Sequence, residues 1–222
     1  MPDGSPALTL HHLRELVDNR DVDTVIVAFT DVQGRLQGKR LHARYFLDDV
    51  LAHGTEACNY LLAVDVDMNT VPGYAMSSWE QGYGDFLLRP DMTTLRPAAW
   101  LPSSVMVQAD VLWLDGSPVR QSPRQILLAQ VQRAVGHNVS VMAGTELEFI
   151  LFEESYEQAW DGGYRGLTPS NRYNVDYSIL GTGRVEPLLR DLRNTMFAAG
   201  LTVDAPFTFS VKCGSVATWG FG

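Results

Sequence analysis

"AGTELEFILFEE", residues 143–154, decides the fold, because an apolar run here carries two closely spaced acids. The four apolar residues from Phe149 to Phe152 are typical of a buried strand. Alternate residues of a strand share a face and lie about 6.6 Å apart, so Glu146 and Glu148 are expected side by side, away from Leu147. Two like charges on a half-buried face cost free energy unless arginines, metal ions, a shared proton or solvent compensate them.

The pattern alone leaves several interpretations of this pair of acids open. Two solvated acids on an exposed strand face are the simplest one. A glycosidase acid/base pair is another, since inverting enzymes hold their carboxyl groups roughly 6.5–9.5 Å apart. Nothing else marks a sugar cleft, because the five tryptophans are scattered along the chain.

Composition favours a reduced, cytoplasmic protein. The 222 residues suffice for one large domain or two small ones, and 45% hydrophobic and 19% charged residues are ordinary for a soluble protein. A net charge of −9 argues against nucleic acid or an anionic membrane as a partner. No apolar run is long enough to span a bilayer, and the first residues lack the pattern of a signal peptide. Cys58 and Cys213 are the only cysteines, which indicates free thiols.

The N-terminal part is predicted to be rich in strands. Thr9 is placed to cap a short helix, and Asp31 and Gly34 bound a turn between two strands of a hairpin, with a bulge at Gly38. The expected elements are a helix at 9–18, strands at 24–30, 35–46, 59–67 and 105–114, a helical turn at 48–54 and a long loop at 68–84.

The second part is predicted to combine helices with the opening strand. Ser122 and Gly136 bound one helix, and a second spans 184–201, with Leu188, Leu192, Met196 and Ala199 on one stripe. A boundary is expected near residues 110–120. The tail 206–222 shows no amphipathic period, so we expect it to pack poorly and to add no strand.

Six stretches in order resemble the glutamine synthetase family, over roughly residues 20–205. They are TDVQGRLQGKR (30–40), GYGDFLLRPDMTTLRPAAWLP (82–102), SPRQILLAQ (122–130), GTELEFILF (144–152), YNVDYSIL (173–180) and LRDLRNTMFAAGLTVDA (189–205). The likeness is strongest to the bacterial branch that includes γ-glutamyl-polyamine synthetases.

The resemblance implies an α+β fold in four parts. An N-terminal helix (1–19) precedes a β-grasp domain (20–115), the incomplete start of the catalytic domain (116–205) and an aberrant tail (206–222). It also implies ATP-dependent ligation of ammonia or an amine, such as a polyamine, to glutamate through γ-glutamyl phosphate, with Mg²⁺ or Mn²⁺, in ring-shaped homo-oligomers.

The resemblance assigns metal-binding roles to the two acids. Glu146 would serve the ion on the nucleotide phosphates, and Glu148 the ion near glutamate, because hard cations prefer oxygen ligands. An acidic loop of the N-terminal domain acts on the incoming amine in the family. Asp65, Asp67, Ser77 and Ser78 are candidates for it here, with plain loop polarity as the alternative.

The chain departs from the family pattern after Ala205, where PFTFSVKCGSVATWGFG stands in place of the next acidic motifs. This departure predicts a shifted or disrupted reading frame and a truncated chain that is inactive on its own. The alternative function is a non-catalytic fragment that contains the β-grasp domain and only associates with intact subunits.

Overall fold

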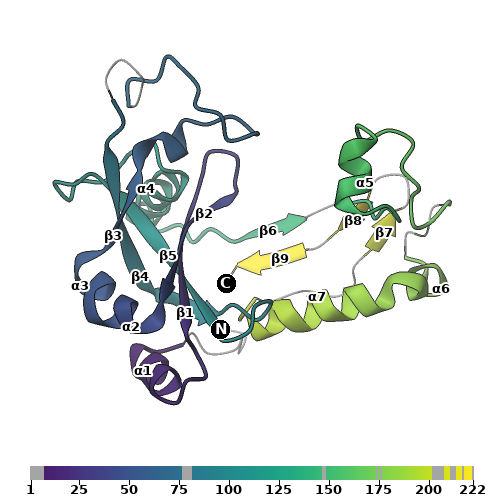
Figure 1. Cartoon of the computed structure of the whole chain (residues 1–222), viewed down its shortest axis with the longest axis horizontal. Coiled ribbons are helices and arrows are strands. Elements are labelled where there is room, and N and C mark those ends of the chain that lie inside the picture. Colours follow the sequence, from purple (N-terminus) through teal and green to yellow (C-terminus); the bar gives the residue numbers. More distant parts are fainter. Residues whose placement is uncertain are drawn as a thin grey trace. The chain divides into compact units, whose positions relative to one another are not determined.

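The structure is a computed structural model that describes residues 8–76, 82–146, 149–173, 175, 177–201, 208–210, 214–216 and 218–221. At 144–146 and after residue 201 it describes the backbone alone. The chain divides into two compact units, Pro6–Val141 and a second one within Met142–Gly222, coloured purple to teal and green to yellow (Figure 1).

The first unit is built on a five-stranded sheet. Its strands are β1 (Thr24–Thr30), β2 (Leu36–His42), β3 (Thr55–Cys58), β4 (Asp85–Pro97) and β5 (Ser104–Leu112), in the order β2-β1-β5-β4-β3. All described pairs are antiparallel except β1 and β5, which run parallel. The β1–β2 hairpin keeps a continuous register through the Ala28–Gly38 pair, so the bulge predicted at Gly38 is wrong. An irregularity lies instead in β4, between Asp91 and Arg96.

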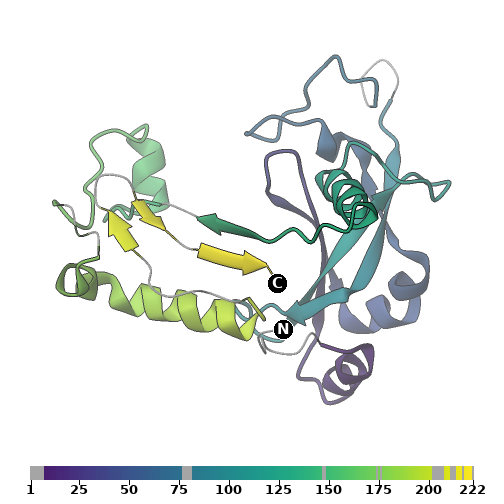
Figure 2. The same ribbon diagram turned by 180° about the vertical axis from the view of Figure 1, so that it is seen from behind.

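The first unit also contains helices and helical turns. They are α1 (Leu10–Asp18), α2 (Ala43–Tyr45), the π-helical turn η1 (Phe46–Val50), α3 (Leu51–His53), the 3-10 turn η2 (Asn59–Leu62) and α4 (Pro123–Gly136). Thr9 caps α1 by accepting a hydrogen bond from the backbone amide of His12, as predicted. The helix α4 contacts β1 and β5, and both views show it against the sheet (Figures 1 and 2).

One continuous core holds the first unit together. Phe29, Phe46, Phe86 and Leu95 are almost completely buried in it. It reaches from Leu13 on α1, across the sheet, to Val119. Burial of this much apolar surface is the main force that stabilises the unit.

The second unit contains shorter elements. They are β6 (Ala143–Glu146), α5 (Tyr156–Asp161), α6 (Ile179–Thr182), the 3-10 turn η3 (Gly183–Val185), α7 (Glu186–Ala198), β7 (Thr208–Ser210), β8 (Gly214–Val216) and β9 (Thr218–Phe221). Strands β6 and β9 pair antiparallel, and so do β7 and β8. The prediction that the tail adds no strand is therefore wrong, since β9 pairs with β6.

Two further predictions in this unit need correction. The strand predicted at 143–152 is described as β6 only up to Glu146, and Phe152 forms an isolated bridge with Pro169. Ile150 and Phe152 are each 43% exposed, so this run is not buried in the described unit. On α7, Leu189 is buried and Leu188 is exposed, so Leu188 departs from the predicted stripe. The rest of the stripe agrees with the prediction, since Leu192 and Met196 are half-buried and Ala199 is buried.

The segment after β3 differs from its prediction as well. The strand expected at 59–67 is wrong: η2 occupies Asn59–Leu62, and a tight turn follows. Leu62 and Val64 are nevertheless buried. The apolar residues that favour a strand are therefore buried in a helical turn and the turn that follows it. The two helices predicted at 122–138 and 184–201 are confirmed as α4 and α7.

Candidate functional site

The two predicted metal ligands lie at the edge of what the structure describes. Glu146 is the last residue of β6, and its backbone is paired with Thr218 of β9. Its side chain and the whole of Glu148 lie outside the described residues, as do Ser77 and Ser78. Across the described ranges, no group of three His, Cys, Asp or Glu side chains could hold a metal ion. The metal-binding roles of Glu146 and Glu148 therefore stay predictions.

The described site with the densest polar contacts lies at the tip of the β1–β2 hairpin. Asp31 is completely buried there, and its carboxylate accepts hydrogen bonds from the backbone amides of Gln33 and Arg35, both at 2.9 Å. The Arg35 guanidinium donates to the same carboxylate at 2.8 Å, and the Gln37 amide donates at 3.1 Å. Burial raises the pKa of Asp31, but these hydrogen bonds outweigh it and hold the pKa below its usual value.

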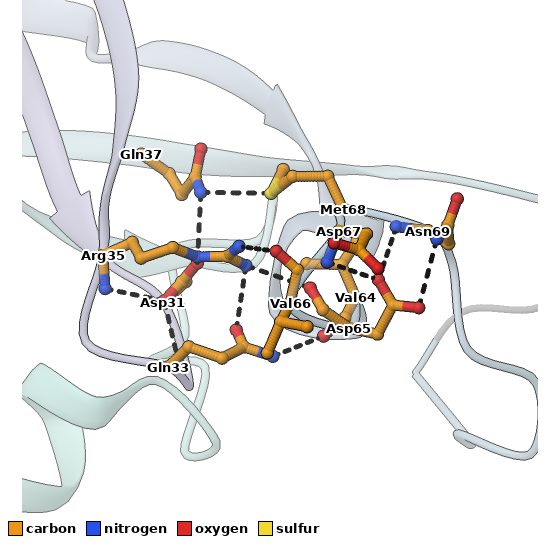
Figure 3. Close-up of polar contacts among 10 residues, drawn as sticks. All are labelled: Asp31, Gln33, Arg35, Gln37, Val64, Asp65, Val66, Asp67, Met68 and Asn69. Carbon is orange, nitrogen blue, oxygen red and sulfur yellow. Dashed lines mark hydrogen bonds and ion pairs between the residues drawn. The ribbon is translucent and has the colours of Figure 1, made fainter. Parts of the chain in front are cut away.

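Side chains of the hairpin tip also donate hydrogen bonds to the segment 63–71, which we call the acidic turn. The amide of Gln33 donates to the carbonyl oxygen of Val64 at 2.7 Å. The guanidinium of Arg35 donates to the carbonyl oxygens of Asp65 and Val66, at 3.2 Å and 2.7 Å. Three consecutive carbonyl groups of the acidic turn are thus bound by two hairpin side chains (Figure 3).

The acidic turn closes on itself. Val64 forms a bridge with Thr70, the amide of Asp65 donates to the carbonyl of Asn69, and Met68 takes a positive φ of 67° at the tip. The Asp65 carboxylate accepts from the backbone amides of Asp67 and Asn69, both at 2.9 Å, and from the Asn69 side chain at 3.2 Å. Asn69 thereby holds the pKa of Asp65 below its usual value. Asp65 is therefore occupied in shaping the turn.

Asp67 differs from Asp65 in this respect. Its side chain is exposed, and no hydrogen-bond partner of its carboxylate is found among the described residues (Figure 3). Val66 and Met68 flank it and are 73% and 37% exposed. The tip therefore presents one free carboxylate between two apolar side chains.

A second ionic cluster fixes α4 to the sheet. The guanidinium of Arg124, in the first turn of α4, donates to the carboxylate of Asp91 on β4, to that of Asp110 on β5 at 2.9 Å, and to the side-chain oxygen of Gln108 at 2.7 Å. Its side chain is 18% exposed, which makes the cluster half-buried. We call this cluster the staple, because one guanidinium donates hydrogen bonds to acceptors on two strands and so fixes α4 to the sheet.

Comparison with known proteins decides the family. Residues 120–210 match the model of the glutamine synthetase catalytic domain. The chain is 62% identical over 203 residues to the γ-glutamylethanolamide synthetase GlnA4 of Streptomyces coelicolor. The chain belongs to the glutamine synthetase family. A glutamate–isopropylamine ligase of a Pseudomonas species is 28% identical over 193 residues.

Solved structures show the same fold. A structure described as apo GmaS without ligand superposes with a TM-score of 0.69 at 20% identity, covering 93% of this chain and 44% of that one. A further structure, described as a novel glutamine synthase homolog, gives 0.67. The mixed α and β architecture is therefore that of glutamine synthetase relatives.

The matches span less than half of each relative. The alignment with the Streptomyces synthetase covers 91% of this chain and 44% of the relative, and that with the Pseudomonas ligase covers 87% and 42%. The glutamine synthetase family is therefore established for this chain, while the activity of the whole relative is a matter for proposal.

Other polar and reactive residues of this glutamine synthetase relative take ordinary places in the fold. Lys39 and Arg40 are exposed on the edge strand β2. Gly181 and Thr182 belong to α6. Cys58 is a half-buried free thiol, as the cysteine count predicts. No described helix has the length and hydropathy that a membrane span requires.

The contacts between the hairpin tip and the acidic turn are not predicted from the sequence. Asp31 and Gly34 indicate a turn there, and neither Gln33 nor Arg35 is a candidate residue in that prediction. Alternate residues of a hairpin share a face, so the spacing of Asp31, Gln33 and Arg35 could have indicated a polar face at the tip. Its partner 31 residues further along could not be read from a local pattern.

Proposed function

We propose that this chain carries part of an ATP-dependent ligase that joins an amine to the γ-carboxylate of glutamate through γ-glutamyl phosphate. The 62% identity to a γ-glutamylethanolamide synthetase over 91% of the chain carries the proposal. The isopropylamine ligase is also named for an amine other than ammonia. A small primary amine is therefore the favoured substrate, with ammonia and a polyamine as the alternatives.

The proposed site uses the two acids of β6 and the segment that follows it. Glu146 and Glu148 would bind Mg²⁺ or Mn²⁺, which offsets the charge of the phosphoryl group during transfer. Carboxylates suit these ions, because both prefer oxygen ligands. Residues 20–115 are assigned to the β-grasp domain in this proposal, and residues 116–205 to the start of the catalytic domain. The reaction needs ATP and glutamate, which fits a cytoplasmic enzyme in a ring of identical subunits.

The test compares two proteins in the same assay. One is the 222-residue chain, and the other is this chain joined after Ala205 to the part of the Streptomyces synthetase that follows the matched segment; we call it the fused chain. Release of ADP and formation of γ-glutamyl product are measured with glutamate, ATP, Mg²⁺ or Mn²⁺, and ammonia, ethanolamine, isopropylamine or a polyamine.

We expect glutamate- and amine-dependent turnover from the fused chain and none from the 222-residue chain. Phosphoryl transfer requires all ligands at once, and the loss of one preorganised group costs roughly 10²–10³ in rate. Glu146→Gln and Glu148→Gln in the fused chain should each abolish turnover, whereas Glu157→Gln on α5 should not. A fused chain that is inactive with every amine would contradict the proposed function. Turnover by the 222-residue chain would contradict the expectation that it is inactive alone.

A further inference from the structure

We propose that a hollow on the five-stranded sheet binds a small aromatic carboxylate, held by the indole of Trp100 and the guanidinium of Arg40. The hollow is lined by β1, β2, Trp100 and one residue of β5, on the face of the sheet opposite the continuous core, which we call the outer face. All of its lining residues lie in the first unit, so this inference goes beyond the proposed function and does not depend on it.

The two faces of the sheet are covered unequally. One face carries the continuous core, to which β1 contributes Val27 and β5 contributes Val107. The alternate residues Ala28 and Met106 belong to a separate, smaller cluster on the outer face. The helix α4 lies over part of the outer face, where Arg124 binds β4 and β5. None of the residues of α4, all of which the structure describes, lines the hollow that remains.

The hollow exists because two paired positions of the outer face have almost no side chain. Ala28 of β1 pairs in register with Gly38 of β2. Gly38 takes a φ of 150°, and a Cβ atom there would lie 2.0 Å from the carbonyl oxygen of Val27, so the backbone itself keeps this position empty. The space has a volume of about 280 Å³. Ligand pockets start at roughly 300 Å³, so the hollow suits a ligand with one ring system and is too small for a nucleotide.

The floor and the wall of the hollow favour a ring over an alkyl chain. Ile26 and Met106 pair in register across β1 and β5 and form an apolar floor. Trp100 lines the hollow with a side chain that is 48% exposed. Aromatic rings that meet in offset or edge-to-face arrangements gain more than their buried area alone provides. An aromatic ligand therefore gains both from the floor and from the indole.

The charges of the lining favour an anion. Lys39 and Arg40 line the hollow and no acid does, although the chain carries a net charge of −9. Arg40 pairs in register with Ile26, which places it on the outer face, whereas the Lys39 ammonium lies 3.4 Å from the hydroxyl of Thr55. Within the described part of the chain, the Arg40 guanidinium has no hydrogen-bond or ion-pair partner. A guanidinium binds a carboxylate through two parallel hydrogen bonds, so a carboxylate is the group that fits it.

The experiment measures binding to the 222-residue chain by isothermal titration calorimetry with three probes. Indole-3-acetate carries both the ring and the carboxylate, indole-3-acetamide carries the ring alone, and hexanoate carries the carboxylate on an alkyl chain. We expect indole-3-acetate to bind about tenfold more tightly than indole-3-acetamide, because the amide lacks the charge that Arg40 binds. We expect hexanoate to bind about fivefold more weakly than indole-3-acetate, because it lacks the ring.

Three variants assign the binding to the hollow. Arg40→Gln should weaken indole-3-acetate about tenfold and leave indole-3-acetamide unchanged, whereas Trp100→Leu should weaken both indole ligands about fivefold. Arg14→Gln is the matched control, since Arg14 is an exposed arginine of α1, and α1 packs against the continuous core through Leu13. It should leave all three affinities unchanged. The three substituted residues are exposed, so the variants should fold normally, which thermal unfolding verifies.

Several outcomes would overturn this inference. The absence of indole-3-acetate binding up to about 10 mM would refute the ligand class. Equal affinities for indole-3-acetate and hexanoate would refute the requirement for a ring, and binding that neither Arg40→Gln nor Trp100→Leu weakens would refute the hollow as its site. Sedimentation at several protein concentrations tests the other occupant, a second copy of this chain. Self-association that Trp100→Leu abolishes, without binding of any probe, would make the hollow a contact between copies and overturn the proposal. None of these measurements uses turnover, so an inactive fused chain would overturn the proposed function and leave this inference standing.

Discussion

The two units of the chain bury their apolar residues to very different extents. In Pro6–Val141 one cluster connects α1, the sheet and Val119, and its aromatic side chains are hidden. In the described part of Met142–Gly222, the buried cluster consists of Val175 and Leu189 with two partly buried neighbours. Ile179 and Leu180 are 86% and 90% exposed there. A unit that hides its apolar surface is stable by itself, whereas one that exposes it depends on further contacts.

This difference in burial matters because the family match and the proposed metal ligands lie mostly in the second unit, which has the smaller buried cluster. The catalytic-domain model covers residues 120–210, while the compact first unit extends to Val141. The helix α4 therefore belongs to the catalytic-domain match by sequence and to the first unit by contact. The expected boundary at residues 115 and 116 remains a prediction.

The sharpest test of this contrast is removal of a core aromatic ring. Phe86 is fully buried and lies edge-on to Trp113, with ring centroids 5.2 Å apart. Phe86→Ala should lower the free energy of unfolding of the first unit by about 3–5 kcal/mol, because a cavity remains. Leu180→Ala, at an exposed position of the second unit, should change the free energy of unfolding by less than about 0.5 kcal/mol. Urea unfolding followed by tryptophan fluorescence measures both changes in free energy, and equal losses in the two variants would contradict the difference between the units.

The next largest effect is expected at the staple between α4 and the sheet. Arg124→Met leaves Asp91 and Asp110 half-buried without their cation, which should cost about 3 kcal/mol. Arg190 of α7 is the control, since it is 71% exposed and lies 3.9 Å from Glu186. Arg190→Met should cost less than about 0.5 kcal/mol. Thermal unfolding at low and high salt would distinguish the two sites, and a harmless Arg124→Met would refute the staple.

The buried carboxylate of Asp31 predicts a dependence on acid pH in the first unit. Its folded pKa lies below the value of 3.8 expected for the unfolded chain. Its ionised form therefore contributes stability above that value, and the contribution is lost as pH falls through the folded pKa. Asp31→Asn should cost about 2 kcal/mol at pH 7, and the gap to the unchanged protein should narrow below about pH 4. A gap that stays constant down to pH 2 would contradict this assignment.

The smallest effect concerns helix capping, where the two units differ again. Ser155 forms a capping box with Gln158 at the start of α5, so Ser155→Ala should cost about 1 kcal/mol. Ser122 precedes α4, but its hydroxyl is buried without a hydrogen-bond partner among the described atoms. Ser122→Ala should therefore be neutral or slightly stabilising. Melting curves and exchange at the first turns of α5 and α4 would show whether the order is reversed.

Local patterns predicted the helices well and the strands unevenly. Caps and apolar periodicity identified α1, α4 and α7, because these signals lie within one or two helical turns of each residue. The apolar run at 59–67 was mistaken for a strand, since a short apolar segment is compatible with several buried conformations. The tail 206–222 lacked any period, yet β9 pairs with β6, because a two-stranded ladder needs backbone groups and no particular side-chain pattern.

The sequence by itself determined the family, the hairpin with its Asp31 turn, the capped helices and the two acids at 146 and 148. Each of these depends on residues close together in the chain or on the order of matching stretches. Only the tertiary structure decided that Arg35 and Gln33 hold the acidic turn, that Asp65 shapes it, and that Asp67 is left free. Those contacts join residues about 30 positions apart, and the physical reason is that folding the hairpin against the turn brings donors to carbonyl groups that no local pattern connects.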